Sequence, residues 1–364
     1  MAQTVMIRTP DPALLDFSNE PEWGYTNGLV LDFIMDVWEK TGDEKYFDYI
    51  VSYYDKMIND DGSIVRDYEM DDYNIDKITP GKNLFEVYQQ TGNEKYKKTL
   101  DILIKQLESH PRTAEGGLWH KKRYTHQMWL DGLYMGSPFM AEYAKKMKQP
   151  SWFDFTAKQL FLAEKNTRDH HTGLLYHGFD ESRNQRWADN ISGQSPNFWG
   201  RAVGWYAMAL VDALDFFPED HYFRDDIIGI LRRLAEAISS VQDPETGVWY
   251  QILDKPDVDG NYLESSASVM FVYALAKGVR NGYLDKKYLD VAKQGYQGVL
   301  ELFIEVDDNG LITLTRTCET AGLGGSGPYR DGTVDYYLSE NIRPNDPKAI
   351  GPFIGASLEI EMLE

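Results

Sequence analysis

The pattern of apolar and polar residues predicts helices along most of the chain. Apolar stretches rich in small residues begin near Tyr25, Thr79, Leu130, Gly200, Glu264 and Gly351. Amphipathic stretches follow most of them, beginning near Glu44, Glu94, Ser151, His221 and Asp285. A helix that is apolar all round is buried, whereas an amphipathic helix buries one face only. The pattern therefore predicts six inner helices that alternate with outer partners.

A weak internal repeat supports this organisation. The segments 38–50 and 88–100 read WEKTGDEKYFDYI and YQQTGNEKYKKTL. Each predicts a helix that ends at a glycine, followed by a turn and a second helix that starts at Asp43 or Asn93. Recurrence at this length is typical of repeated helical hairpins, and the lack of a polar capping repeat favours a closed ring over an open solenoid. We predict one (α/α)6 barrel, a toroid of six helical hairpins, over residues 1–364, with the N-terminal segment as the sixth outer element.

The predicted connections differ in length at the two ends of the ring. Links from inner to outer helices are short, whereas the links back are long: 60–79, 110–129, 169–199, 243–263 and 306–350. Long loops on a rigid scaffold commonly carry function. All of them gather above the N-termini of the inner helices, where the helix dipoles favour an anionic ligand. We therefore expect the functional site at this end.

Composition and charge narrow the function. The net charge of −21 argues against nucleic acid or an anionic membrane as a partner. Cys318 is the only cysteine, so no disulfide can form within the chain. The N-terminal residues show no signal-peptide pattern and no stretch reaches membrane-spanning length, so we expect a cytoplasmic protein that is a monomer or a weak homo-oligomer. Its 24 Tyr and 9 Trp suit sugar-binding surfaces as well as core packing.

The segment HQMWLDGLYMGSP, residues 126–138, carries the clearest chemical signal. It places Asp131 in the first turn of a predicted helix, two residues after Trp129. Burial beside a tryptophan would raise the pKa of this carboxyl and suit it to proton donation near neutrality. The alternative is an acid that the helix dipole merely favours in a first turn.

Further polar and aromatic residues fall on the same predicted rim. They are Asp76, His120, Lys121, His177, Trp199, Arg201 and Trp205. Arginine or lysine could pair with the carboxylate of a sugar acid, and tryptophan could stack on its ring. Each also has a structural alternative: Asp76 could cap a loop, Arg201 could bridge helices, and His177 could be a buried structural histidine. The chain contains no HExxH motif and no cysteine cluster, so we expect no metal and no cofactor.

These residues lie in motifs that resemble glycoside hydrolase family 105, the unsaturated rhamnogalacturonyl hydrolases. The resemblance runs over nearly the whole chain, from WGYTNGLVL to GPFIGASLEIEM. Its most specific parts are GGLWHKK, HQMWLDGLYMGSPF, SPNFWGRAVGW, TGVWYQILD and YLESSAS. The family fold is an (α/α)6 barrel, which agrees with the repeat pattern.

The resemblance implies an unusual reaction on a small acidic oligosaccharide. Such enzymes act on the 4,5-unsaturated uronic acid that a polysaccharide lyase leaves at a non-reducing end. An acid protonates C4, water adds at C5, and the hemiketal collapses and releases the neighbouring sugar, typically rhamnose. Asp131 matches the proton donor, which also acts as base for the water. Asp76 matches a second aspartate, expected to hold sugar hydroxyls and to raise the pKa of Asp131 by like-charge proximity.

The remaining predicted residues match positions that line the substrate in this family. They are His120, Lys121, Trp129, His177, Trp199, Arg201 and Trp205. Segment 318–337 is expected to help select the leaving sugar. Three alternatives stay open: an unsaturated glucuronyl hydrolase acting on ulvan or another acidic glycan, a sugar epimerase on the same toroid, and a catalytically silent glycan-binding toroid.

Overall fold

The computed structural model describes residues 1–325 and 327–364. Its helices form an inner set around a common centre and an outer set that surrounds it. The inner helices are α2 (Tyr25–Thr41), η3 (Ile75–Gly81) with α4 (Leu84–Thr91), α6 (Leu130–Lys146), α8 (Gly200–Leu214), α10 (Ser265–Arg280) and α13 (Pro347–Glu361). The outer helices are α3 (Glu44–Met57), α5 (Glu94–Ser109), α7 (Ser151–Thr167), α9 (Arg224–Ser240) and α11 (Lys287–Phe303).

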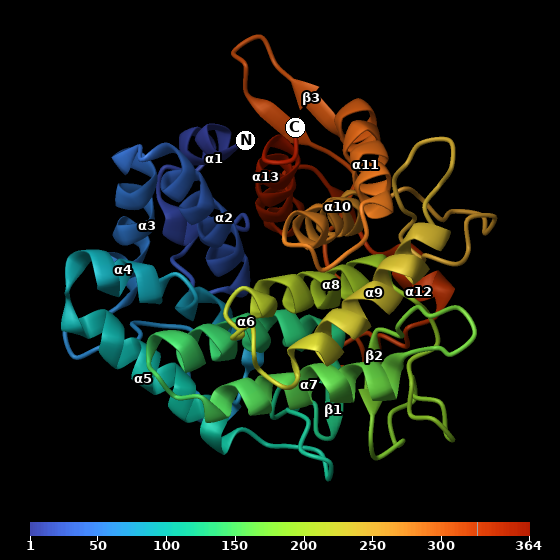
Figure 1. Cartoon of the computed structure of the whole chain (residues 1–364), viewed down its shortest axis with the longest axis horizontal. Helices are drawn as coiled ribbons and strands as arrows, with labels where there is room; N and C mark the ends of the chain where they lie inside the picture. The colour runs from blue at the N-terminus through green and yellow to red at the C-terminus, as the bar shows by residue number, and fades with distance from the viewer. Residues whose placement is uncertain (326) are drawn as a thin grey trace.

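The inner helices form a closed ring. Each packs against the next along the chain, and α13 packs against α2. The outer helices lie around this ring (Figure 1). The prediction of a toroid of helical hairpins, closed rather than open, is confirmed.

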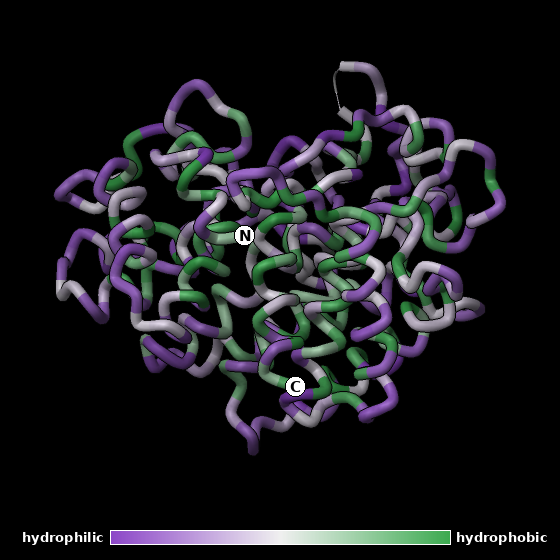
Figure 2. The backbone as a smooth tube through the Cα atoms, turned by 90° about the horizontal axis from the view of Figure 1, so that it is seen from above, coloured by the Kyte–Doolittle hydropathy of each residue, from purple (hydrophilic) through white to green (hydrophobic). Residues whose placement is uncertain are grey.

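The composition of the inner helices explains their close packing. Every residue of α8 is buried. A side chain at Gly204 would bring its Cβ within 2.8 Å of the Met270 sulfur on α10, so glycine is needed for this approach. Hydrophobic residues concentrate in the interior of the molecule and hydrophilic ones in the outer loops (Figure 2).

Two inner elements differ from their predicted starts. The second begins as the 3-10 helix η3 and continues as α4, because Pro80 lacks the amide hydrogen that a regular helix needs. The last begins at Pro347 rather than near Gly351, because Asp346 caps its first turn by accepting from the Lys348 amide and Pro347 suits the first helical position.

Short elements connect the hairpins. The helical ones are α1 (Ala2–Arg8), η1 (Pro12–Leu14), η2 (Met70–Asp72) and α12 (Val334–Ser339). The strands pair antiparallel as β1 (Gln127–Trp129) with β2 (Gly178–Asp180), β3 (Ile304–Val306) with β4 (Ile312–Leu314), and β5 (Thr317–Cys318) with β6 (Ile342–Arg343). No helix in the described ranges is long and apolar enough to cross a membrane.

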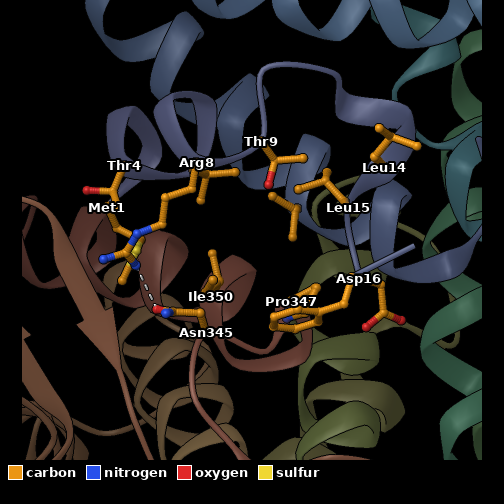
Figure 3. A pocket seen from close by; sticks show the side chains of 13 residues that line it. Met1, Thr4, Arg8, Thr9, Leu14, Leu15, Asp16, Asn345, Pro347 and Ile350 are labelled. Carbon is orange, nitrogen blue, oxygen red and sulfur yellow. Dashed lines mark hydrogen bonds between the residues drawn. The ribbon is translucent and has the colours of Figure 1, made fainter. Parts of the chain in front are cut away.

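The N-terminal helix α1 lies near the start of α13 (Figure 1), and residues of both line one pocket. Met1 packs against a hydrophobic cluster that includes Ala349 and Phe353 of α13, and Arg8 donates hydrogen bonds to the Ile312 carbonyl and the Asn345 side chain. Figure 3 shows a pocket of about 240 Å³ between α1, η1 and the start of α13. None of the predicted site residues lines this pocket.

Candidate active site

The N-termini of the inner helices carry several of the predicted site residues. Asp131 is the second residue of α6, and Trp129 occupies the N-cap position before it. Arg201 is the second residue of α8. The pairing of β1 with β2 fixes the approach to α6, because the Leu130 amide donates to the His177 carbonyl at 3.0 Å. The long loops therefore supply side chains directly to the ends of these helices.

Asp131 and His177 face each other across this junction. The imidazole Nε2 lies 3.1 Å from the carboxylate Oδ2, and the His177 side chain is fully buried. Their orientation does not meet hydrogen-bond geometry, and neither atom has another partner in the described residues. Two buried polar atoms without hydrogen-bond partners destabilise the folded protein unless a ligand supplies those hydrogen bonds. They mark this place as a candidate binding centre.

The structure corrects the expected pKa of Asp131. Burial does raise the pKa of this carboxyl, as the sequence predicted, but the contact with His177 outweighs burial and holds the pKa below its usual value. The carboxyl is therefore ionised near neutral pH in the free protein. The expected raised pKa is wrong for this state, because the sequence does not show which side chain opposes the carboxyl.

A second polar group surrounds Asp76. Lys121 Nζ lies 2.5 Å from one oxygen of Asp76, and His120 Nε2 lies 3.4 Å from the other. Burial would raise the pKa of Asp76, yet Lys121 and His120 hold it below its usual value. Burial lowers the pKa of His120 to about 4, so this imidazole is neutral near pH 7.

This arrangement also corrects the predicted coupling between the two aspartates. We expected the charge of Asp76 to raise the pKa of Asp131, but the carboxylate of Asp76 is neutralised by Lys121. The groups that shift the pKa of Asp131 are His177 and His120, after burial itself. Because a paired charge acts weakly on a third group, Asp76 does not hold Asp131 protonated.

Aromatic rings lie between the polar residues around Asp76 and those around Asp131 and pack against both histidines. Trp129 stacks on His120 with ring centroids 4.5 Å apart and meets His177 edge-on at 5.7 Å. Trp199 lies 4.7 Å from the His177 ring. The structure thus joins the Asp76 and Asp131 groups through one aromatic wall. Trp205 lies deeper and contacts Tyr134 and Tyr25 instead.

Arg201 is buried beneath this wall. Its guanidinium donates to the Cys318 carbonyl, lies 3.4 Å from the Ser266 hydroxyl, and stacks 4.7 Å from the Trp199 ring. The side chain is only 1% exposed, and its Nε has no partner in the described residues. Arg201 therefore joins α8 to strand β5 and, through Ser266, to α10, while its Nε keeps one donor without a partner in the described residues.

Sequence reasoning missed three residues at this end of the ring. Glu264 caps α10 by accepting from the amides of Ala267 and Cys318, and only its place in the YLESSAS motif pointed to it. Tyr25 opens α2 and contacts Trp205. Tyr337 hydrogen-bonds His177 from far along the chain, and no local pattern signals that contact. In the described ranges, no three His, Cys, Asp or Glu side chains could together hold a metal ion.

Comparison with known proteins agrees with this geometry. The model of glycosyl hydrolase family 88 matches residues 1–364. A family 105 glycoside hydrolase from Clostridium acetobutylicum (C. acetobutylicum ATCC 824) shares 46% identity over 99% of this chain and 98% of its own, with a TM-score of 0.95. The chain therefore belongs to the glycoside hydrolases that the family 88 model recognises, and among them to family 105.

Two further relatives bear on activity and fold. The unsaturated rhamnogalacturonyl hydrolase YesR of Bacillus subtilis shares 28% identity over 75% of both chains. The unsaturated glucuronyl hydrolase of Bacillus sp. GL1, responsible for degradation of glycosaminoglycan, shares 16% identity over 99% of this chain and 94% of its own, with a TM-score of 0.71. At that identity the second likeness shows the fold alone, a helical toroid of six hairpins.

Proposed function

We propose that the protein releases 4,5-unsaturated galacturonic acid from the non-reducing end of rhamnogalacturonan oligosaccharides produced by a lyase. The observation that carries this proposal is the partly exposed carboxyl of Asp131 opposite the buried His177, where Oδ2 and Nε2 lie 3.1 Å apart and neither has a hydrogen-bond partner in the described residues. Such a carboxyl can deliver a proton to one carbon of an enol ether and accept one from water afterwards.

The reaction balances with one water molecule. Asp131 donates its proton to C4, and the water oxygen adds to C5 while its proton returns to the carboxylate. The C5–O5 bond of the resulting hemiketal then breaks and leaves a ketone at C5. The hemiacetal so formed at C1 releases the neighbouring sugar with its oxygen. No covalent bond forms between the protein and the sugar.

Substrate binding must change the ionisation of Asp131 before this step. The carboxyl is ionised in the free protein because its pKa is held low. A bound uronate brings a second negative charge and displaces water, and both effects favour the protonated form. We propose that Asp76 and Lys121 hold the sugar hydroxyls and that His120, Trp129 and Trp199 line the sugar ring. Arg201 would direct its free Nε toward the substrate carboxylate.

The leaving oligosaccharide would extend along a cavity on the outer side of the aromatic wall. This cavity has a volume of about 570 Å³ and is lined by Arg123, Tyr124, Gln185, Tyr329 and Arg330, among others. Tyr124 stacks on Trp129 at 4.6 Å, so the cavity adjoins the proposed proton donor. Its lining includes residues from segment 318–337, which supports a role of that segment in choosing the leaving sugar. The relative YesR is an unsaturated rhamnogalacturonyl hydrolase, which favours a rhamnogalacturonan substrate over a glucuronyl one.

The test uses purified oligosaccharides that differ in one sugar. Unsaturated galacturonyl-rhamnose, an unsaturated glucuronyl disaccharide and the saturated analogue of the first are incubated with the protein. Ultraviolet absorbance of the conjugated double bond is followed while released sugar is measured. We expect absorbance to fall and rhamnose to appear with the first substrate. Turnover of the glucuronyl disaccharide alone would transfer the activity to the alternative substrate, and unchanged absorbance with all three would reject the hydrolase.

A further inference from the structure

Tyr337 lies directly behind His177, on the side away from Asp131. Its hydroxyl is 2.7 Å from His177 Nδ1, and its ring stacks on Trp199 at 5.9 Å with an interplanar angle of 16°. The Tyr337 side chain is fully buried, so it cannot touch a ligand bound beside Asp131. It belongs to α12 and is the last residue of segment 318–337, which the sequence analysis expects to help select the leaving sugar.

The chain of contacts fixes the position of two protons. The ionised carboxylate of Asp131 can only accept, so the nitrogen that faces it, Nε2 of His177, must carry a hydrogen. In the Nε2–H tautomer Nδ1 is bare and accepts the hydrogen of Tyr337. Burial raises the pKa of Tyr337 well above its usual range, so the phenol keeps this hydrogen at any working pH.

We propose that Tyr337 is a positioning residue that holds His177 in its Nε2–H tautomer and thereby keeps the protonated nitrogen beside the carboxylate of Asp131. Its consequence for turnover rests on the proposed function, whereas the tautomer itself does not. The contact orients the carboxyl, so one oxygen faces His177 and the other is free to exchange a proton with the substrate. The hydrogen bond joins residues 160 apart in sequence. It connects segment 318–337 to the histidine that faces the proposed proton donor.

The direct test is nitrogen NMR of the histidine side chains in the full-length protein. The Tyr337→Phe variant keeps the ring and removes only the hydroxyl. Tyr336→Phe is the matched control, because the Tyr336 hydroxyl accepts from the Gly322 amide and does not meet His177. His177 is assigned by the signals lost in a His177→Gln variant. We expect a pure Nε2–H tautomer in the wild type and the control, and a mixture or the Nδ1–H tautomer in Tyr337→Phe. A wild-type His177 that carries its hydrogen on Nδ1 would overturn the proposal even if Tyr337→Phe failed to fold.

Kinetics supply the second measurement. Loss of the fixed donor weakens the stabilisation of the Asp131 carboxylate, so its pKa rises and the alkaline limb of the rate profile moves to higher pH. The other groups facing this pair are His120 beside Asp131, and Tyr336, Cys318 and Asp331 around Tyr337, all of which the variant retains. We expect kcat to fall about tenfold with little change in KM, as for the loss of one buried hydrogen bond.

The outcomes separate this inference from the proposed function. A tautomer change without any turnover in the wild type would reject the proposed substrate and leave the positioning role intact. Wild-type turnover with an unchanged tautomer, kcat and pH limb in Tyr337→Phe would reject the positioning role alone.

Discussion

At Asp131, burial and a neighbouring imidazole act on one carboxyl in opposite directions. Burial favours the neutral acid, whereas His177 at 3.1 Å favours the carboxylate, and the carboxylate prevails in the free protein. A proton donor of this kind needs the substrate to complete its environment. Under the proposed function, substrate binding and proton delivery are linked at this one residue.

Replacing Asp131 by asparagine tests that role. The amide is nearly isosteric but cannot deliver a proton, so we expect kcat to fall by about 10²–10⁴-fold, the range typical of general acid catalysis. Calorimetric titration with the unsaturated disaccharide should show retained binding. Asp290→Asn is the matched control, because Asp290 is a first-turn acid on the outer helix α11. Retention of more than about a tenth of wild-type kcat would return Asp131 to a purely structural role.

Asp76 gives a prediction opposite to the one its sequence position suggested. Because Lys121 neutralises Asp76, the Asp76→Asn variant should leave the alkaline limb of the pH profile in place. It should instead raise KM, since Lys121 loses the partner that holds it against the sugar. Lys121→Gln should act in the same direction. A limb that moves to lower pH in Asp76→Asn would show that the two carboxylates are coupled after all.

At the scale of elements, the first turns of α8 and α10 and strand β5 form one buried junction. Arg201 donates to the Cys318 carbonyl and Glu264 accepts from the Cys318 amide, so both polar groups of one strand residue are held. A buried backbone group that loses its partner costs about 1–3 kcal/mol. This junction fixes the start of segment 318–337 relative to the aromatic wall.

The Arg201→Ala variant measures how much of Arg201 is structural. We expect the free energy of unfolding to fall by about 2–4 kcal/mol, because the buried Cys318 carbonyl loses its donor and nearby acidic side chains lose the positive charge of Arg201. We also expect KM to rise. Urea unfolding is the measurement, with Arg233→Ala as the control, since the exposed pair of Arg233 with Glu164 is worth about 0–1 kcal/mol. An unchanged unfolding midpoint would contradict the bridging role.

The elements show what the sequence could and could not predict. Periodicity placed the helices and the glycine caps Gly42 and Gly92, which the structure confirms as left-handed C-caps. It misplaced the start of the second inner helix, where Pro80 forces a 3-10 turn. Motifs identified Asp76, Asp131 and His177 as a group. The contacts of Asp131 with His177 and of Asp76 with Lys121 depend on tertiary approach, which no local pattern records, and so the predicted direction of the Asp131 pKa was wrong.

For the whole molecule, two buried histidines make stability depend on pH. Burial lowers the pKa values of His110 and His120 to about 4, whereas an unfolded chain binds these protons near 6.5. Between those values the unfolded state binds more protons, so the free energy of unfolding falls as pH drops from about 6.5 to about 4. Each histidine contributes up to about 3 kcal/mol by this linkage.

Urea unfolding across this pH window checks the prediction. A His110→Gln variant should lose part of the acid sensitivity, whereas His171→Gln, at an exposed position, should keep all of it. The low pKa values of Asp76 and Asp131 act further down the scale, because their stabilisation is present above the usual aspartate range and is lost as pH falls through their own values. A free energy of unfolding that stays constant from pH 6.5 to 4 would contradict this account.

We propose that the protein hydrates a double bond instead of attacking the anomeric carbon. The most direct measurement is turnover of unsaturated galacturonyl-rhamnose in heavy water, with early product examined by NMR. We expect one deuterium at C4 and loss of the double bond in step with rhamnose release, and we expect neither event in Asp131→Asn. Rhamnose released alongside an intact unsaturated uronic acid, with no deuterium at C4, would contradict it.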